Sequence, residues 1–168
     1  VDPQHDDTVY MGAADGGIWK TVDGGATWAS IGDELDTQAI GAIAIATGRP
    51  DTLYVGTGEA VTSQDAYFGL GVYRSTDGGA TFAKVGGTLF DRKTVFKILA
   101  PVNGGFVYAA TNQGLYRSTD FGDTWELALA PGDTNTFGNF VSDVISLEGD
   151  GTRLLAAIGW RGGAPSNG

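Results

Sequence analysis

One eight-residue pattern occurs three times in this 168-residue chain. It reads TVDGGATW at 21–28, STDGGATF at 75–82 and STDFGDTW at 118–125, so an Asp always precedes a Gly and then an aromatic residue at fixed spacing. A second shared stretch comes before the later copies, GVYRS in one case and GLYRS in the other. Internal repetition on this scale is typical of solenoids and propellers, in which each repeat is one supersecondary unit.

The spacing of the copies indicates which kind of repeat this is. Asp77 and Asp120 are 43 residues apart, close to the roughly 40 to 50 residues of one four-stranded propeller blade. Asp23 and Asp77 are further apart, and we assign the excess to a long loop, EAVTSQDAYFGLG, at 59–71. Short runs rich in Val, Ile, Tyr, Thr and Phe are separated by Gly, Asn and Asp, and no stretch has a helical period. The sequence therefore predicts an all-β fold, a β-propeller with four-stranded antiparallel blades.

The chain should contain about three and a half blades. For the second repeat we expect strands at 39–47, 52–58, 71–77 and 81–86, whereas the first and fourth repeats are incomplete. About four to eight blades close a ring, so we expect part of a larger propeller, or a chain that pairs its open strands at 8–14 and 153–160 with another. The expected limits are blade 1 at about 1–36, blade 2 at about 37–90, blade 3 at about 91–136 and incomplete blade 4 at about 137–168.

Composition narrows the range of partners. Twenty acidic and ten basic residues give a net charge of −10, so a nucleic acid would be repelled and is not expected as a partner. Cysteine is absent, which excludes disulfides and thiolate metal sites. No apolar run approaches the about 20 residues that span a bilayer, so direct membrane insertion is not expected. The one histidine, His5, has no cluster of partners, and we predict neither a metal nor a cofactor.

The repeated octapeptide has the composition of a hairpin turn between the third and outer strands of a blade. Its Asp can accept backbone N–H bonds, the Gly can adopt the positive φ that the turn needs, and the aromatic residue can begin the outer strand. A calcium loop would need a denser series of oxygen ligands. We therefore assign a structural role to Asp23, Gly25, Trp28, Asp77, Gly79, Phe82, Asp120, Gly122 and Trp125.

These octapeptides resemble Asp-boxes, also called bacterial neuraminidase repeats, with the pattern Ser/Thr-x-Asp-x-Gly-x-Thr-Trp/Phe. Such boxes occur in sialidases, other propeller glycosidases, sortilin-type receptors and photosystem II assembly factors, where they are peripheral folding elements. The stretch GTGE, followed by a variable loop and GVYRSTDGG, is similar to sortilin-like propellers of large exported bacterial proteins. The resemblance implies the fold more firmly than the function.

The candidate binding residues lie on the face opposite the repeat turns. Turns at the two ends of antiparallel strands alternate between faces, so the turn from second to third strand and the blade-to-blade connections share the other face. Aromatic and hydrogen-bonding residues in these loops suit glycan or peptide recognition, although the rings could instead pack within their own loops and Glu59 could accept nearby N–H groups. The candidates are Glu59, Asp65, Tyr67, Phe68, Phe137, Trp160 and Arg161.

Three other basic residues and two families of propeller glycosidases bear on the assignment of this site. Arg74 and Arg117 hold equivalent places before two boxes, with Lys20 at the third, which favours a role on the blade surface. A sialidase needs three converging arginines and a Tyr nucleophile, and its Phe-Arg-Ile-Pro motif is absent. Xyloglucan-cleaving propeller hydrolases carry a catalytic Asp before a Gly-Gly pair; the aligned position here is Ala14, with Asp15 one residue late. No catalytic residue is assigned.

We therefore expect an extracellular or cell-envelope propeller of a bacterium that recognises a glycan, protein or peptide, or serves as a scaffold, without catalysis in this segment. The alternative is a portion of a propeller glycoside hydrolase, sialidase-like or xyloglucan-cleaving, whose carboxylates come partly from outside the segment. A third possibility is an assembly factor for a membrane complex. A catalytic Asp or Glu pair in the rest of the protein would favour the hydrolase, whereas a C-terminal cell-surface or secretion domain would favour the first interpretation.

Overall fold

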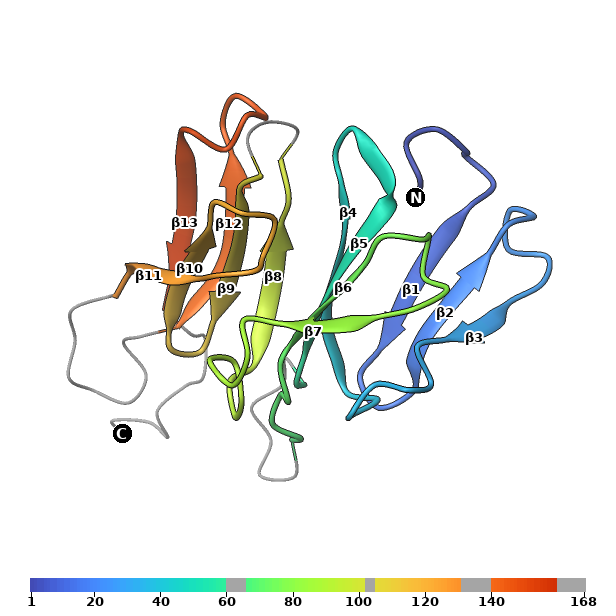
Figure 1. Ribbon diagram of the computed structural model, residues 1–168, viewed down its shortest axis with the longest axis horizontal. Coiled ribbons are helices and arrows are strands. Elements are labelled where there is room, and N and C mark those ends of the chain that lie inside the picture. Colours follow the sequence, from blue (N-terminus) through green and yellow to red (C-terminus); the bar gives the residue numbers. More distant parts are fainter. Residues whose placement is uncertain (60–65, 102–104, 131–139, 160–168) are drawn as a thin grey trace, which may run out of the picture.

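The computed structural model describes residues 1–59, 66–101, 105–130 and 140–159, which form four antiparallel β-sheets arranged side by side as a fan (Figure 1). These residues contain thirteen strands and no helix, so none of them forms a helix that could cross a membrane. The sheet orders are β1-β2-β3, β4-β5-β6-β7, β8-β9-β10-β11 and β12-β13. The strands are β1 (Val9–Ala13), β2 (Gly17–Thr21), β3 (Ala29–Ile31), β4 (Ile40–Ala46), β5 (Arg49–Thr57), β6 (Val72–Ser75), β7 (Ala83–Val85), β8 (Val95–Leu99), β9 (Val107–Thr111), β10 (Gly114–Ser118), β11 (Glu126–Leu129), β12 (Val141–Ser146) and β13 (Leu154–Ile158).

This architecture confirms the prediction of a partial β-propeller. The four strands expected in the second repeat are β4 to β7, and each neighbouring pair is antiparallel. The inner strand turns earlier than expected, because β5 already begins at Arg49, which pairs with Ala46 across a tight turn. Each sheet lies within one of the blade ranges inferred from the sequence, and we retain those limits as a proposal.

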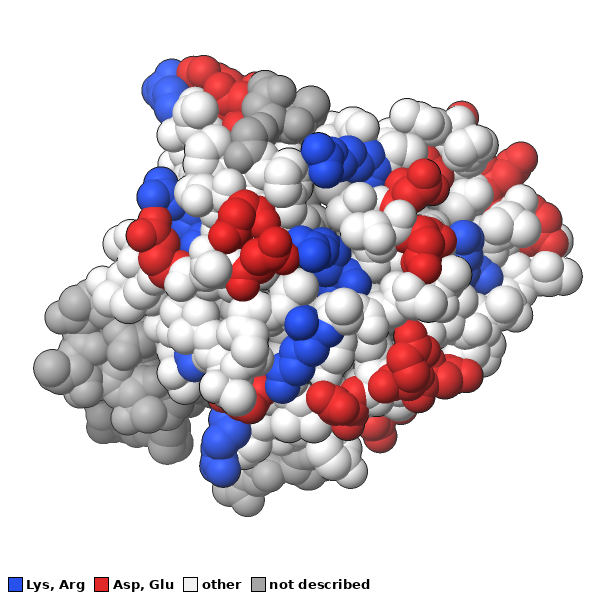
Figure 2. Space-filling view, in the orientation of Figure 1, with Lys and Arg blue, Asp and Glu red and all other residues white. Residues whose placement is uncertain are grey.

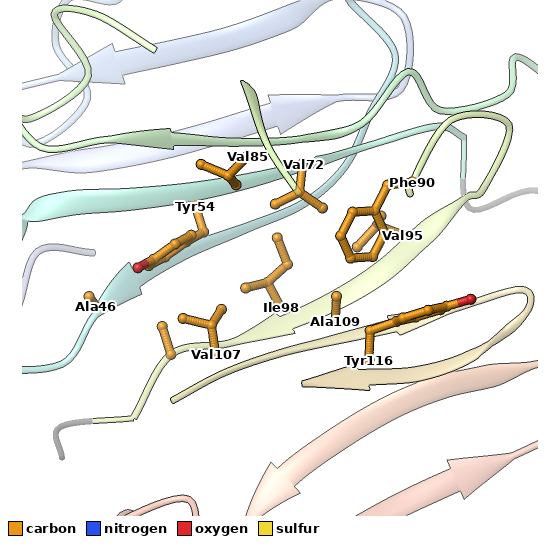
Figure 3. Close-up of a cluster of buried hydrophobic side chains, with 11 residues drawn as sticks. Ala46, Tyr54, Val72, Val85, Phe90, Val95, Ile98, Val107, Ala109 and Tyr116 are labelled. Carbon is orange, nitrogen blue, oxygen red and sulfur yellow. The ribbon is translucent and has the colours of Figure 1, made fainter. Parts of the chain in front are cut away.

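The core lies between the sheets. Figure 3 shows the cluster between the second and third sheets, where side chains such as Tyr54 and Val107 are buried against one another. Phe90, in the connection between these sheets, is fully buried and meets the rings of Tyr116 and Trp125 edge-on, with centroids 5.3 and 5.0 Å away. Smaller clusters join the first sheet to the second and the third to the fourth. Burial on both faces explains why β9 is buried along its whole length.

Glycine permits the closest approach between the second and third sheets. A Cβ at Gly56 would lie 2.4 Å from Cγ1 of Val95, and one at Gly41 would lie 2.3 Å from the backbone oxygen of Val95. Neither position has room for a side chain. These glycines are therefore required by packing, in contrast to the turn glycines described below.

The outermost strands of the described fan have free edges. Within the described residues, β1 pairs with β2 alone and β13 pairs with β12 alone. Leu155 and Ile158 on β13 remain 60% and 55% exposed, although the equivalent strand β9 is buried. These are the edges that the sequence analysis expected to be unpaired, and they are available to further strands.

Candidate functional site

The turns divide the fan into two faces. In Figure 1 the turns that carry the repeats, β2–β3, β6–β7 and β10–β11, point upward together with the β4–β5 turn. The loop from β5 to β6 and the connections from β3 to β4 and from β7 to β8 lie at the bottom. We call these the repeat-turn face and the loop face. For the described part of the loop from β5 to β6, the predicted separation from the repeat turns is therefore confirmed.

The carboxylate of each repeat Asp accepts hydrogen bonds from residues of its own turn. Asp77 accepts hydrogen bonds from the Thr81 amide (2.9 Å), the Thr81 hydroxyl (2.6 Å) and the Ser75 hydroxyl (2.7 Å). The Thr81 bonds lower the pKa of Asp77 to about 2. Asp23 and Asp120 make the same three kinds of bond and have pKa values lowered to about 2 for the same reason. These bonds are the ones expected of a carboxylate with a structural role in the turn.

Gly and the aromatic residue complete the turn. Gly79 has φ of 88°, and its amide donates to the buried Ser75 hydroxyl at 2.9 Å. The indole nitrogens of Trp28 and Trp125 donate to the carbonyl of the preceding turn glycine, at 3.2 and 2.7 Å. Phe82 occupies the same place without a ring N–H and packs against the core of the first two sheets. The ring thus closes the hairpin in every copy.

A second repeated device links neighbouring blades, and its tyrosines were missed by the sequence analysis. A tyrosine and a basic residue of one blade both donate to one backbone carbonyl in the repeat turn of the next blade. The pairs are Tyr10 (3.1 Å) and Lys20 (2.9 Å) on the oxygen of Gly78, and Tyr54 and Arg74 (both 2.8 Å) on the oxygen of Phe121. The recurrence of Lys20 and Arg74 in the sequence was the available signal, and the structure shows that they act across blades.

Arg117, the third member of this set, has a different contact. Its guanidinium pairs with Glu126 of the adjacent strand, and Tyr108 donates to the oxygen of Gly151 at 2.7 Å. Arg74 also pairs with Asp123, at 2.9 Å. All three basic residues therefore contribute to the blade surface.

On the loop face, Glu59 and Tyr67 close the long loop between β5 and β6. The Glu59 amide donates to the Tyr67 oxygen at 3.0 Å, and the Tyr67 amide donates to Glu59 Oε2 at 3.2 Å. This arrangement is the structural alternative considered for Glu59. The side chains of Tyr67 and Phe68 remain 59% and 58% exposed. Asp65, Phe137, Trp160 and Arg161 lie outside the described residues.

A buried hydroxyl fixes the return of this loop to β6. Thr57 Oγ1 donates to the oxygen of Gly71 at 2.7 Å and accepts from the amides of Leu70 (2.9 Å) and Gly71 (3.0 Å). Thr111 holds the equivalent turn of the third sheet, since its hydroxyl donates to Gly114 at 2.8 Å. Neither threonine was singled out from the sequence, where the shared signal is a Thr at the end of the second strand.

The connection between the second and third sheets adds a residue that the sequence analysis also missed. Arg92 has φ of 62°, a left-handed conformation that is uncommon for a residue with a side chain. Its amide donates to the oxygen of Gly69 at 2.8 Å, and its guanidinium carbon lies 5.4 Å from the centroid of the Phe68 ring. This contact brings two loops together. No local pattern in the sequence marks it.

The histidine, the acidic residues and a surface hollow are the remaining candidate features of the described chain. His5 lies 3.2 Å from Asp2 and has no other charged partner in the described chain. No group of three or more His, Cys, Asp or Glu that could hold a metal occurs among the described residues. A surface hollow of about 340 Å³ lies between β1 and β4, and Tyr10 is the one titratable side chain in its lining, which comprises Val1, Pro3, Tyr10, Ile43, Ile45 and Thr47.

Comparison with known proteins finds similar propeller structures. No protein-family model matches the chain. A curated relative, a xyloglucanase from Paenibacillus sp, is 28% identical over 151 residues, which cover 79% of this chain and 14% of that protein. The solved GH74 xyloglucanase from Xanthomonas campestris has a TM-score of 0.70 and 20% identity over 98% of this chain and 26% of its own. Another solved propeller, YCF48 bound to D1 peptide, has a TM-score of 0.51 and 19% identity, covering 71% of this chain and 36% of its own.

These comparisons establish the fold. The chain spans about one seventh of the curated relative and about a quarter of the solved xyloglucanase. At 19–20% identity, the two structures show that the described sheets are part of a β-propeller and do not transfer an activity. Both glycan-cleaving and peptide-binding proteins are represented among them.

Proposed function

We propose that this chain is part of an exported bacterial β-propeller that binds glycans through its loop face. The observation that carries the proposal is the exposed pair of rings, Tyr67 and Phe68, held by a loop that Glu59 and Thr57 close with hydrogen bonds. Exposed aromatic rings offer flat apolar area, which suits the C–H face of a sugar ring. Polymeric glycans are met outside the cell, which favours an extracellular or cell-envelope location.

The repeat turns support the resemblance to Asp-boxes. All three copies share the same acceptor and donor pattern around the Asp, and all three lie away from the loop face. In sortilin-like and glycosidase propellers such boxes are peripheral, so this resemblance allows either a binding module or an enzyme. It leaves the loop face as the place where the two functions differ.

Glycan cleavage by the whole protein is the second candidate function, favoured by the xyloglucanase relatives. Asp15 is the exposed carboxylate in the short turn between β1 and β2. It lies one residue beyond the position that the catalytic Asp occupies in the xyloglucan-cleaving pattern. An inverting hydrolase needs two carboxyl groups about 6.5 to 9.5 Å apart. The partner of Asp15 would therefore come from another part of the protein.

Affinity electrophoresis of the full protein in gels that contain xyloglucan, mixed-linkage β-glucan or glucuronoxylan tests the first proposal. We expect at least one polysaccharide to retard the protein, and the double substitution Tyr67→Ala, Phe68→Ala to weaken that retardation by about tenfold, the effect of losing about 1.4 kcal/mol of contact. Leu127→Ala is the matched control, because Leu127 is 50% exposed on the outer strand β11. Reducing-sugar release from the same polysaccharides, with Asp15→Asn as the test variant, measures cleavage.

The outcomes separate the two functions. Retardation that is lost in the ring variant and kept in the control, without sugar release, supports a binding module. Sugar release that depends on Asp15 supports the hydrolase. A full protein that none of the polysaccharides retards, or one retarded equally with and without the rings, contradicts the glycan-binding face.

A further inference from the structure

Arg92, an arginine on the loop face, has no acidic partner among the described residues. The side chain of Arg92 makes no hydrogen bond or ion pair within the described part of the chain; its one contact of this kind is with the face of the Phe68 ring. The adjacent carboxylate of Asp91 is taken by Lys84, whose Nζ lies 2.7 Å from it. Lys93 points elsewhere, since its Nζ donates to the oxygen of Leu89. Arg92 is thus the exposed cation of this loop pair.

Arg92 and Arg49 are the two described arginines without an acidic partner. The chain has twice as many acidic as basic residues, and acidic side chains lie beside several basic ones on the face shown in Figure 2. Three other described arginines are paired in this way, Arg74 with Asp123, Arg117 with Glu126 and Arg153 with Glu148. The sequence supplies carboxylates in excess, yet none of the described ones neutralises Arg92.

The backbone holds Arg92 in a defined place. Its left-handed φ of 62° is fixed by the bond from its amide to Gly69 and by the bridge between Leu70 and Asp91. Phe90, fully buried two residues earlier, anchors the same connection in the core. A residue held in a sparsely populated conformation at a binding face is a recurrent feature of functional sites. The backbone therefore places the cation beside the exposed Phe68 ring.

We propose that Arg92, Tyr67 and Phe68 form a binding site for a carboxylated sugar, a uronic acid residue within a glycan chain. The guanidinium carbon lies over the Phe68 ring, 5.4 Å from its centroid, and no described group accepts a hydrogen bond from the guanidinium, so its N–H groups can donate two parallel bonds to a carboxylate. The exposed rings then contact the pyranose that carries this carboxylate. The inference rests on the proposed glycan-binding function and specifies its ligand.

The test compares two forms of one polysaccharide. Binding of the full protein to glucuronoxylan is measured by isothermal titration calorimetry, alongside binding to the same glucuronoxylan after its carboxyl groups have been reduced to alcohols. We expect the acidic form to bind about tenfold more tightly or better, as for a charge-assisted pair. Arg92→Gly should abolish this preference without lowering Tm, because Gly adopts a positive φ freely.

Arg49→Gln is the matched control variant. Arg49 also stacks on a ring, 4.2 Å from the centroid of Phe121, and also lacks a described acidic partner, but it lies at the β4–β5 turn on the repeat-turn face. This variant should keep the preference for the acidic form. Poly-L-glutamate, which carries carboxylates without sugar rings, serves as a second probe and should bind weakly.

The unfavourable results are distinct. Equal binding of the acidic and reduced forms, or a preference that survives in Arg92→Gly, overturns the uronic acid site while leaving glycan binding intact. Poly-L-glutamate that binds as tightly as glucuronoxylan shows that the site reads a carboxylate without its sugar and overturns the inference as well. Failure of both forms to bind, in a protein that no other polysaccharide retards, contradicts the glycan-binding proposal itself.

Discussion

The repeat-turn face and the loop face are built from the same strands and differ in what repeats. On the repeat-turn face, three turns share one set of hydrogen bonds, their carboxylates are satisfied, and tyrosine and basic side chains connect each turn to its neighbour. On the loop face, the long loop at 59–71 has no counterpart of its length in the first or third sheet, and it presents exposed rings. Repetition therefore marks residues that maintain the fold, and its interruption marks the candidate site.

The loop face nevertheless has its own structural anchors. Phe90 fills the core from the connection that carries Arg92, and Thr57 fixes the end of the long loop with a buried hydroxyl. The exposed candidate binding residues are thus held in place by buried residues of the same loops. The faces therefore differ in their exposed side chains. Substitutions can distinguish the buried residues that stabilise the fold from the exposed residues proposed to bind.

The largest expected effect is on the free energy of unfolding, and it contrasts two phenylalanines of the loop face, Phe90 and Phe68. Phe90→Ala should lower the free energy of unfolding by about 3–5 kcal/mol, because it removes a buried ring and leaves a cavity. Phe68→Ala should change it by about 0.5 kcal/mol or less, since that ring is exposed. Chemical denaturation of the full protein measures both. Similar losses for the two variants would show that Phe68 supports the fold and would remove it from the binding site.

A smaller effect compares one buried hydroxyl from each face. Ser75→Ala strands the Gly79 amide, and Thr57→Val strands the amides of Leu70 and Gly71, so each should destabilise the protein by about 1–3 kcal/mol. Thermal unfolding followed by circular dichroism measures this loss. Glycan affinity should fall in Thr57→Val and stay unchanged in Ser75→Ala.

The control for this pair comes from the chain itself. Thr21 occupies the place of Ser75 in the first repeat and makes the same bonds, so Ser75→Thr should retain stability. Thr57→Ser should do so as well. A Ser75→Ala variant that loses glycan affinity as strongly as Thr57→Val would mean that the two faces are not independent.

The propeller fold was predictable because its signals are local and repeated. The octapeptide encodes a complete turn, in which Asp77, Gly79 and Ser75 satisfy one another, so the same letters give the same structure three times. The opposite placement of turns and loops follows from antiparallel pairing alone. Even the strand limits of the second repeat differ by only a few residues from those expected.

The details of the loop face were not predictable, because they depend on contacts between two different loops. Arg92 reaches Phe68 only because the two loops pair at Leu70 and Asp91, a bridge with no sequence pattern. The tyrosines that bind the next blade are likewise ordinary strand residues until the sheets are placed side by side. Glu59 illustrates the reverse case: its type suggested chemistry, and its bond to the Tyr67 amide assigns it to the loop.

The smallest expected effect is the response of the repeat-turn face to acid. The folded-state pKa values of Asp23, Asp77 and Asp120 are about 2, below the ordinary value of 3.8, because threonine side-chain and backbone groups donate to the charged carboxylates. A lowered folded pKa means that the stabilisation is complete above pH 4 and is lost as the pH falls toward 2. The Tm should therefore decline through this window, and modestly, because the three carboxylates are exposed to solvent.

Substitution of the three carboxylates assigns that decline to the turns. The triple variant Asp23→Asn, Asp77→Asn, Asp120→Asn should have a lower Tm at pH 7 and a flatter Tm profile between pH 4 and 2, since its amides do not titrate there. Glu34→Gln, at a position without a hydrogen bond or ion pair in the described chain, should keep the wild-type profile. A triple variant with an unchanged slope would place the acid sensitivity elsewhere. The loop face would then also contribute to stability at low pH. The two faces would differ less in structural role than their hydrogen bonds indicate.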